Sequence, residues 1–239
     1  MRRVLVTGGG TGIGRAIAHA FCDAGDAVVI SGRRLEPLEA TAQDRNITCQ
    51  IADVTDEAAV STLFDAPFDV VVANAGGGTS SKLGATSLAD WNATLAVNLT
   101  GTFLTFRAAL ADMPDGGRLI AIASTAALQG QAMIPAYAAA KHGVLGLVRS
   151  VAQDVAARGV TCNAICPGFT DTELAETAIK GVMARFDISR EKATGMVTSG
   201  NPQGRLIAPQ EVAATALFLA SPAAASINGH ALSISGGEI

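Results

Sequence analysis

Short runs of apolar, often β-branched residues alternate with longer amphipathic stretches along the whole chain, and this alternation constrains the fold more than any other feature. Most of the runs are apolar at every position, which is typical of strands buried on both faces of a parallel sheet. We predict strands at residues 3–6, 27–31, 47–52, 69–73, 118–123, 160–166 and 231–235. The stretches between them predict helices at residues 13–24, 34–43, 56–64, 88–110, 135–157 and 209–220. This order predicts an α/β fold, a doubly wound parallel sheet of about seven strands with helices on both faces.

No linker, repeat or low-complexity tract divides the 239 residues, so we predict one domain over residues 1–239. One segment departs from the alternation. Residues 170–206 are polar, contain Gly195 and Gly200, and are far longer than the roughly 2–6 residues that usually join a strand to a helix. Because such insertions often cover a binding site, we interpret residues 170–206 as a lid over a substrate.

Charge and composition exclude several classes of protein. The 17 Lys and Arg residues are outnumbered by 21 Asp and Glu residues, whereas a general nucleic-acid binder carries a basic surface. No apolar run reaches the ~18–20 residues that span a bilayer, and the N-terminal run is too short for a signal peptide. We therefore expect a soluble cytoplasmic protein with no nucleic-acid or membrane partner. The four cysteines form no CxxC pair, so we expect reduced thiols and no metal site.

A glycine-rich turn follows the first predicted strand and opens the first predicted helix, with the sequence TGGGTGIG at residues 7–14. Glycine lets the backbone approach a pyrophosphate closely, and a helix N-terminus offers free N–H groups and the positive end of its dipole. The spacing differs from the usual G-x-G-x-x-G fingerprint, and a plain tight turn is the alternative. The position between strand and helix favours a Rossmann-type dinucleotide site that includes Gly8, Thr11, Gly12, Ile13 and Gly14.

The end of the second predicted strand bears on the choice of cofactor. Dinucleotide folds that bind NAD usually place an acidic residue there, where it holds the ribose hydroxyls. This chain has Gly32, Arg33 and Arg34 instead. An arginine at that point can grip a 2′-phosphate with two hydrogen bonds. We therefore favour NADP(H), with NAD(H) as the alternative, and expect Arg33 to make the contact and Arg34 to be solvated.

The sharpest chemical signal is Tyr137-Ala138-Ala139-Ala140-Lys141, which contains the only tyrosine of the chain. A Tyr and a Lys four residues apart lie on one face of a helix. Ser124 follows a predicted strand upstream, and Asn98 lies in a predicted helix. A Tyr-x-x-x-Lys match alone is common by chance. The prediction of a catalytic site therefore depends on the combination of these residues with the glycine turn.

In these motifs the chain resembles the single-domain branch of the short-chain dehydrogenase/reductase family, over essentially its whole length. Further motifs in the expected order strengthen the resemblance. They are Asp53-Val54, Asn74-Ala75-Gly76, Pro167-Gly168 with Thr172, and the closing Asn228-Gly229 and Gly236-Gly237. One departure is Thr11, at a position where members that prefer NADP often carry a basic residue.

The resemblance implies a role for each matched residue. Asn98, Ser124, Tyr137 and Lys141 would form a catalytic tetrad, and Tyr137 and Lys141 would also contact the cofactor. Asp53 would bind the adenine amine with Val54 beside it, while Asn74, Ala75 and Gly76 would line the adenosine ribose. Pro167, Gly168 and Thr172 would contact the nicotinamide half.

These residue types suit the reduction of a ketone, in which a hydride reaches carbon and a proton reaches oxygen. Tyr137 would supply the proton, and the ammonium group of Lys141 is expected to lower the pKa of Tyr137 from its usual ~10. Ser124 would donate a hydrogen bond to the substrate oxygen. Asn98 would hold a water molecule that links Lys141 to solvent. The alternatives are that Ser124 caps a turn, that Asn98 bonds nearby backbone, and that Lys141 is a solvated helix residue.

We therefore expect an NAD(P)-dependent oxidoreductase that interconverts a ketone and a secondary alcohol. The overall pattern is similar to family members that reduce 3-oxoacyl thioesters. The basic lid residues would then meet a thioester carrier, unless they form a solvated helix face; they are Lys180, Arg185, Arg190 and Lys192. One alternative is an NAD-dependent dehydrogenase of a small polyol, sugar or cyclic alcohol, and another is a non-enzymatic protein that senses a dinucleotide.

The two longest predicted helices, residues 88–110 and 135–157, bear on assembly. We expect each to carry an apolar exterior, built from Ala108, Ala109, Val144, Leu147, Val151 and Val155. Members of the family usually pair these helices across a two-fold axis. The resemblance therefore implies a homotetramer, or at least a dimer.

Overall fold

Seven parallel strands form one sheet in the computed structural model, which describes residues 1–239. The strands are β1 (Arg3–Thr7), β2 (Ala27–Gly32), β3 (Ile47–Ile51), β4 (Val70–Ala73), β5 (Arg118–Ile122), β6 (Thr161–Pro167) and β7 (Ala231–Ile234). Their order is β3-β2-β1-β4-β5-β6-β7. The chain therefore winds outward from β1 to β3 and crosses back to place β4 on the other side of β1. In doubly wound sheets such a reversal opens a crevice at the carboxyl ends of the strands.

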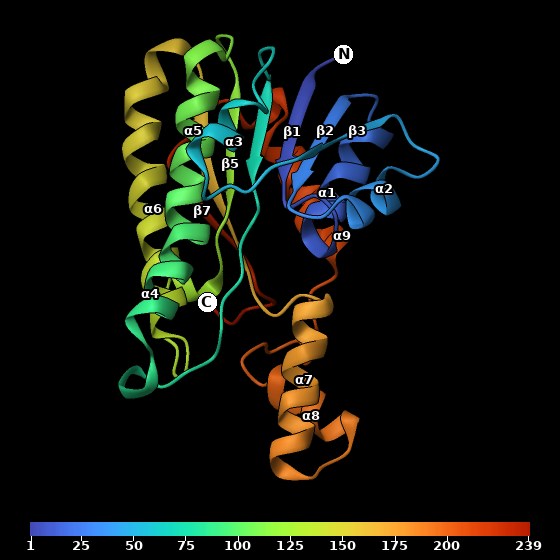
Figure 1. Cartoon of the computed structure of the whole chain (residues 1–239), viewed down its shortest axis with the longest axis vertical. Coiled ribbons are helices and arrows are strands. Elements are labelled where there is room, and N and C mark those ends of the chain that lie inside the picture. The colour runs from blue at the N-terminus through green and yellow to red at the C-terminus, as the bar shows by residue number, and fades with distance from the viewer.

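Helices cover both faces of this sheet (Figure 1). One face is covered by α1 (Gly12–Asp23) and α9 (Pro209–Leu219), which pack against each other, and the other by α5 (Gly101–Asp112) and α6 (Pro135–Val155). The remaining helices are α2 (Leu35–Ala42), α3 (Glu57–Ser61), α4 (Leu88–Leu95), α7 (Glu173–Phe186) and α8 (Arg190–Val197).

The core lies in two layers, one on each side of the sheet. Val4 and Val6 of β1 pack with Ile17 of α1 on one side, and Leu5 packs with Phe106 of α5 on the other. All five side chains are buried. Successive residues of a strand point to opposite faces, so a strand covered on both faces needs an apolar residue at each position. The predicted doubly wound fold is therefore confirmed.

The predicted single helix over residues 88–110 is wrong in one respect. The structure divides it into α4 (Leu88–Leu95), a π-helical segment (Ala96–Thr100) and α5 (Gly101–Asp112). A Cβ atom at Gly101 would lie 2.8 Å from Cγ2 of Val54, so a glycine is needed where the start of α5 packs against the loop after β3. A π-helical turn holds one residue more than an α-helical turn, which hydrophobic periodicity does not reveal.

The expected apolar exterior of the long helices is also wrong in part. Ala109, Val144 and Val155 are buried in the core between the sheet and α5 and α6. Leu147 and Val151 remain partly exposed. Most of the apolar residues on these helices face the sheet, because they cover the apolar side chains of its strands.

The predicted lid, residues 170–206, contains two helices that could not be assigned from its polar composition. Figure 1 shows α7 and α8 as a pair that projects beyond the sheet, at the end where β6 leads into α7. The two helices pack against each other more than against the sheet. None of the helices in the molecule has the length and apolar composition that a membrane span requires.

Candidate active site

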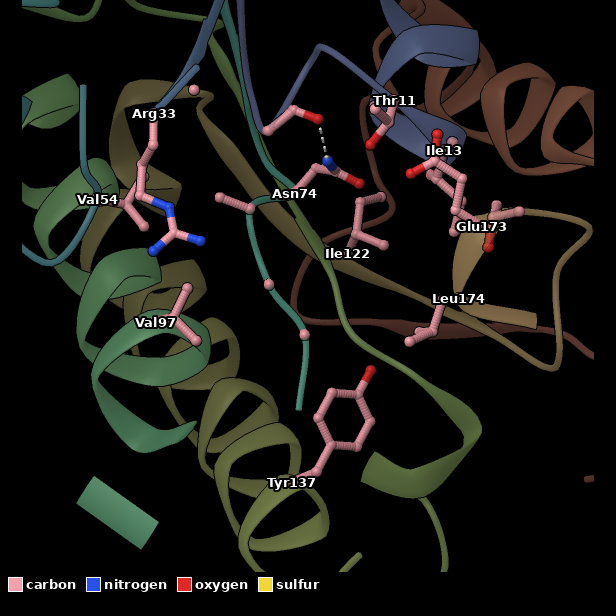
Figure 2. A pocket seen from close by; sticks show the side chains of 18 of the residues that line it. Thr11, Ile13, Arg33, Val54, Asn74, Val97, Ile122, Tyr137, Glu173 and Leu174 are labelled. Atoms are coloured by element: carbon pink, nitrogen blue, oxygen red, sulfur yellow. Dashed lines mark hydrogen bonds between the residues drawn. The ribbon is translucent and has the colours of Figure 1, made fainter. Parts of the chain in front are cut away.

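A cavity of about 500 Å³ opens at the carboxyl ends of the central strands. Loops that follow β1 to β5 line it, together with α6 and the start of α7 (Figure 2). Most of the predicted site residues meet here: Gly8, Thr11, Gly12, Ile13, Gly14, Arg33, Asp53, Val54, Asn74, Ala75, Gly76, Tyr137, Lys141 and Thr172. Four predicted residues do not line the cavity: Asn98, Ser124, Pro167 and Gly168.

The glycine turn after β1 is packed so closely that side chains would not fit. Gly8 and Gly12 have φ angles of +66° and +50°, a region that side chains disfavour. A Cβ atom at Gly14 would lie 2.2 Å from the carbonyl oxygen of Gly8. Thr11 precedes α1 without a side-chain cap, so the first N–H groups of the helix have no capping partner from it. This is the arrangement in which a helix N-terminus binds an anionic group.

Asn74 ties the loop after β4 to this turn. Its Nδ2 donates hydrogen bonds to the carbonyl oxygens of Thr7 (2.9 Å) and Gly8 (3.1 Å), and Figure 2 shows its side chain between the two loops. The N–H of Ala75 donates to Oγ1 of Thr7 at 3.1 Å. The two loops on either side of the strand reversal are thus fixed relative to each other.

Arg33 and Asp53 lie in the part of the cavity bordered by β2 and β3. The exposed guanidinium of Arg33 lines the cavity (Figure 2) and takes part in none of the salt bridges of the molecule. Asp53 Oδ1 accepts hydrogen bonds from the N–H (2.9 Å) and Oγ1 (2.8 Å) of Thr55. The hydrogen bond from the Thr55 N–H is the main cause that lowers the pKa of Asp53, and the charge of Arg33 is a smaller cause. Arg33 is therefore a cation free to meet an anionic group in the cavity.

Tyr137 and Lys141 lie one turn apart on α6, with Lys141 Nζ 5.5 Å from the centroid of the Tyr137 ring. Nζ donates a 2.8 Å hydrogen bond to the carbonyl oxygen of Ile122 at the end of β5. Lys141 is buried, and this burial lowers its pKa to about 8. Lys141 is therefore not a solvated helix residue.

The structure corrects the expected pKa of Tyr137. Loss of solvent around the ring raises this pKa, and a hydrogen bond from Ser124 acts in the opposite direction as a smaller cause. Lys141 lies beside the ring and donates to Ile122, so its charge does not offset the loss of solvent. The phenol is held in its neutral form.

Ser124 has the turn-capping role that was the alternative for it, and its donation to a substrate oxygen stays a prediction. Its Oγ accepts a hydrogen bond from the N–H of Ala126 at 3.1 Å and so caps the short 3₁₀ helix Thr125–Ala127. Its hydroxyl also lies close enough to Tyr137 to act on the pKa of the phenol, which it lowers. The cap fixes the hydroxyl beside the phenol.

Asn98 lies in the π-helical segment and is fully buried. Its Nδ2 donates to the carbonyl oxygens of Gly77 (2.6 Å) and Thr94 (2.9 Å), and its Oδ1 accepts from the N–H of Gly77 at 3.2 Å. A Cβ atom at Gly76 would lie 2.7 Å from Asn98 Oδ1 and 3.4 Å from Lys141 Nζ. Asn98 thus bonds nearby backbone and holds the loop after β4, and the water molecule expected beside it stays a prediction.

The segment predicted to be a lid contributes residues that the motifs did not indicate. Glu173, Leu174 and Thr177 of α7 line the cavity beyond the predicted Thr172. Positions 173, 174 and 177 share one face of a helix, so a predicted helix starting at Thr172 would have found them. Gly168 lies outside the cavity because its N–H donates to the carbonyl oxygen of Ile234 and holds the turn after β6 against β7.

Comparison with known proteins adds an independent line of evidence. A family model described as enoyl-(acyl carrier protein) reductase matches residues 8–238. The chain is 37% identical to D-threitol dehydrogenase of Mycolicibacterium smegmatis, over 98% of this chain and 91% of the relative. It is 35% identical to a 3-oxoacyl-[acyl-carrier-protein] reductase of Vibrio harveyi, over 98% of this chain and 95% of the relative. The fold superimposes on actinorhodin polyketide ketoreductase, solved with NADPH, with a TM-score of 0.92 and 31% identity over 99% and 97% of the two chains.

Proposed function

The chain belongs to the short-chain dehydrogenase/reductase family, and we propose that it interconverts a ketone and a secondary alcohol in the cavity over the central strands, with Tyr137 as general acid and base. The observation that carries this proposal is that Tyr137 and Lys141 line one side of a cavity whose other side holds the glycine turn and Arg33. Figure 2 shows Tyr137 and Arg33 at its two ends. One side provides an acid, and the other provides the features of a nucleotide site.

The residues present fit NADP(H). The crowded glycines leave the backbone free to approach a pyrophosphate at the start of α1, and side chains there would fill that space. Arg33 is available for a 2′-phosphate, and Gly32, Arg33 and Arg34 stand at the end of β2, where NAD-binding folds usually have an acidic residue. Asp53, Val54, Ala75 and Gly76 line the part of the cavity between these groups and Tyr137. NAD(H) is the alternative.

When bound, the nicotinamide would supply or accept the hydride. In the reductive direction the ketone oxygen would accept hydrogen bonds from the hydroxyls of Tyr137 and Ser124. The Tyr137 proton would pass to this oxygen as negative charge develops on it. The raised pKa of Tyr137 means that the phenol carries its proton near pH 7, and the charge that develops on the ketone oxygen would draw this proton away.

Lys141 would stabilise the phenolate left after this transfer. Its pKa of about 8 keeps most of the ammonium form near pH 7, and its Nζ lies 5.5 Å from the ring centroid. The carbonyl oxygen of Ile122 fixes the ammonium in this place. Tyr137 would then regain a proton from solvent on the Lys141 side.

The substrate would enter beneath residues 170–206, acting as a lid on a single domain. The helices α7 and α8 project from the sheet, and Leu174 at the start of α7 lines the cavity while 58% of its surface is exposed. The names of the relatives include a polyol dehydrogenase and an acyl-carrier-protein reductase. A small ketone or alcohol, free or thioester-linked, is the coarse substrate class.

We also propose that the protein assembles as a homotetramer, or at least a dimer, through α4, α5 and α6. The partly exposed Leu147 and Val151, together with Phe103 (41% exposed), provide apolar surface on these helices after the core has taken Val144 and Val155. Light scattering of the purified protein at micromolar concentration tests this, and a monomer would contradict it.

Assays in both directions test the proposed activity. Purified protein should consume NADPH in the presence of a ketone and form NADPH from NADP⁺ and the matching alcohol. Ser124→Ala should lower kcat by about 10²-fold, as removal of one oxyanion donor does elsewhere, and leave NADPH binding intact. A protein that binds NADPH but turns over no ketone or alcohol would instead be a dinucleotide sensor.

A further inference from the structure

A second cavity of about 510 Å³ shares none of the lining residues of the first. Two segments that begin at predicted site residues lead to it. One runs from Ser124 to Gln129, and the other runs from Gly168 to Phe169. Helix α7 borders both cavities, with Leu174 in the first and Val182 in the second. The second cavity is therefore where the part of a substrate beyond its carbonyl group would extend.

Glu238, next to the last residue of the chain, places a carboxylate in this cavity. Its Oε1 accepts a hydrogen bond from Nε2 of Gln129 at 3.1 Å. A Cβ atom at Gly168 would lie 3.1 Å from its Oε2, so the carboxylate lies against the backbone of the turn after β6. Glu238 is partly buried and has no salt-bridge partner, since the nearby Arg205 is paired with Glu211 at 2.6 Å.

The other walls of the cavity suit hydroxyl groups. Of the twelve lining residues only four are hydrophobic, and the polar side chains include Gln131, Ser199 and Asn201. A hydrocarbon chain placed here would remove water from the Glu238 carboxylate without offering a hydrogen bond, which is costly. An anionic group would meet the like charge of Glu238, and the guanidinium of Arg205, which also lines this cavity, is already engaged by both carboxylate oxygens of Glu211 (2.6 and 2.8 Å). A neutral hydroxyl would instead donate to the carboxylate in a charge-assisted hydrogen bond, the stronger kind.

Two of the four basic residues expected to meet a thioester carrier are paired with one carboxylate of the predicted lid. Arg190 is bound to Glu176 through both carboxylate oxygens (2.8 and 2.6 Å), and Lys180 lies 3.5 Å from the same carboxylate. Neither lines either cavity. The Arg190–Glu176 pair thus joins α8 to α7, while Arg185 and Lys192 are exposed, form no salt bridge and line neither cavity.

We propose that Glu238, positioned by Gln129, is a specificity-determining residue that accepts a hydrogen bond from a substrate hydroxyl, so that the enzyme acts on short polyhydroxylated ketones and the matching polyols. The inference rests on the proposed function, because it extends the substrate from the carbonyl beside Tyr137 into the second cavity. Reduction would then convert the ketone and a proton, with a hydride from NADPH, into the polyol and NADP⁺.

Four probes of one carbon skeleton test this directly: erythrulose, 2-butanone, acetoacetate and the acetoacetyl thioester of N-acetylcysteamine. The wild type should show the highest kcat/KM with erythrulose. Glu238→Leu should lower kcat/KM for erythrulose by about 10- to 100-fold, the range for loss of a hydrogen bond to a charged group, and leave 2-butanone unchanged. Glu238→Gln keeps the shape of the side chain and should lower kcat/KM for erythrulose less. It should raise kcat/KM for acetoacetate relative to that for 2-butanone, because the negative charge of Glu238 is gone.

The control is Glu191→Gln, which removes an exposed carboxylate of α8 that lines neither cavity and forms no salt bridge. It should leave all four values unchanged. NADPH binding and thermal unfolding of each variant report whether it folds, and Glu238→Gln carries the test should Glu238→Leu fail to fold. Equal losses with all four probes, or a wild-type preference for the thioester or for 2-butanone, would overturn the inference and leave the proposed function standing. Absence of turnover with every probe would overturn both.

Discussion

Lys141 Nζ lies 5.5 Å from the centroid of the Tyr137 ring while it donates a hydrogen bond to the carbonyl oxygen of Ile122. The ammonium group is thus fixed by the end of β5 and does not depend on the phenol for its position. Burial raises the pKa of Tyr137 and lowers that of Lys141 to about 8, so the ammonium loses its proton well before the phenol does. Near pH 7 this pair holds a neutral phenol beside an ammonium, the protonation state that ketone reduction needs.

The pH dependence of reduction follows from this pair. Lys141 loses its proton as the pH rises through about 8, so kcat for ketone reduction should be level near pH 7 and fall above pH 8. In Lys141→Arg the guanidinium stays charged, so any residual activity should no longer fall there. A pH profile with saturating NADPH and ketone measures this. A falling limb at the same pH in both proteins would contradict the role given to Lys141.

Arg33 should decide the cofactor preference. Arg33→Ala should weaken NADPH binding by about 10- to 100-fold, because a charge-assisted contact to the 2′-phosphate is lost, and change NADH binding by less than about threefold. Fluorescence titration measures both dissociation constants. Arg34→Ala is the matched control, since Arg34 is exposed and lines neither cavity. A wild type that prefers NADH would favour the NAD-dependent polyol dehydrogenase.

Gly14→Ala should damage the nucleotide site and the fold together. The new methyl group would lie 2.2 Å from the Gly8 carbonyl oxygen and 2.5 Å from Asn74 Nδ2, so the turn must shift, at a cost of about 1–3 kcal/mol in unfolding free energy. Urea denaturation and NADPH titration measure the two effects. Gly181→Ala on α7 is the control, because a Cβ atom there meets nothing within 4 Å, and it should stabilise the protein by up to about 1 kcal/mol. Undiminished NADPH binding in Gly14→Ala would argue against the turn as the pyrophosphate site.

Asn98→Ala should act mainly through stability. It removes the hydrogen bonds to Gly77 and Thr94 and leaves buried backbone groups without partners, which should cost about 1–3 kcal/mol. Activity should recover at low temperature if the loop after β4 is only loosened. Loss of turnover with an unchanged free energy of unfolding would instead favour the water molecule expected between Asn98 and Lys141.

The fold and most of the cavity follow from local signals in the sequence. Strands buried on both faces read as apolar runs, and a glycine turn between strand and helix marks the edge where ligands bind. Arg33, Tyr137 and Lys141 could therefore be assigned to one site from the sequence alone, and the family resemblance is confirmed. The homotetramer and the water molecule beside Asn98 stay predictions.

The features that could not be predicted depend on contacts between distant segments. The outward or inward orientation of Val144 is decided by which face of α6 meets the sheet. The raised pKa of Tyr137 comes from the surrounding packing, which a Tyr-x-x-x-Lys spacing does not describe. Gln129 and Glu238 are 109 residues apart, and only the tertiary fold brings them to one cavity.

The most direct test of the account is Tyr137→Phe, which removes one hydroxyl group and keeps the ring. NADPH consumption with a ketone and NADPH binding by titration should be measured on the same preparations of wild type and variant. Turnover should fall by about 10²- to 10⁴-fold, the usual contribution of a positioned acid, while the NADPH dissociation constant should stay within about threefold. Turnover that survives at the wild-type rate would contradict Tyr137 as the proton donor.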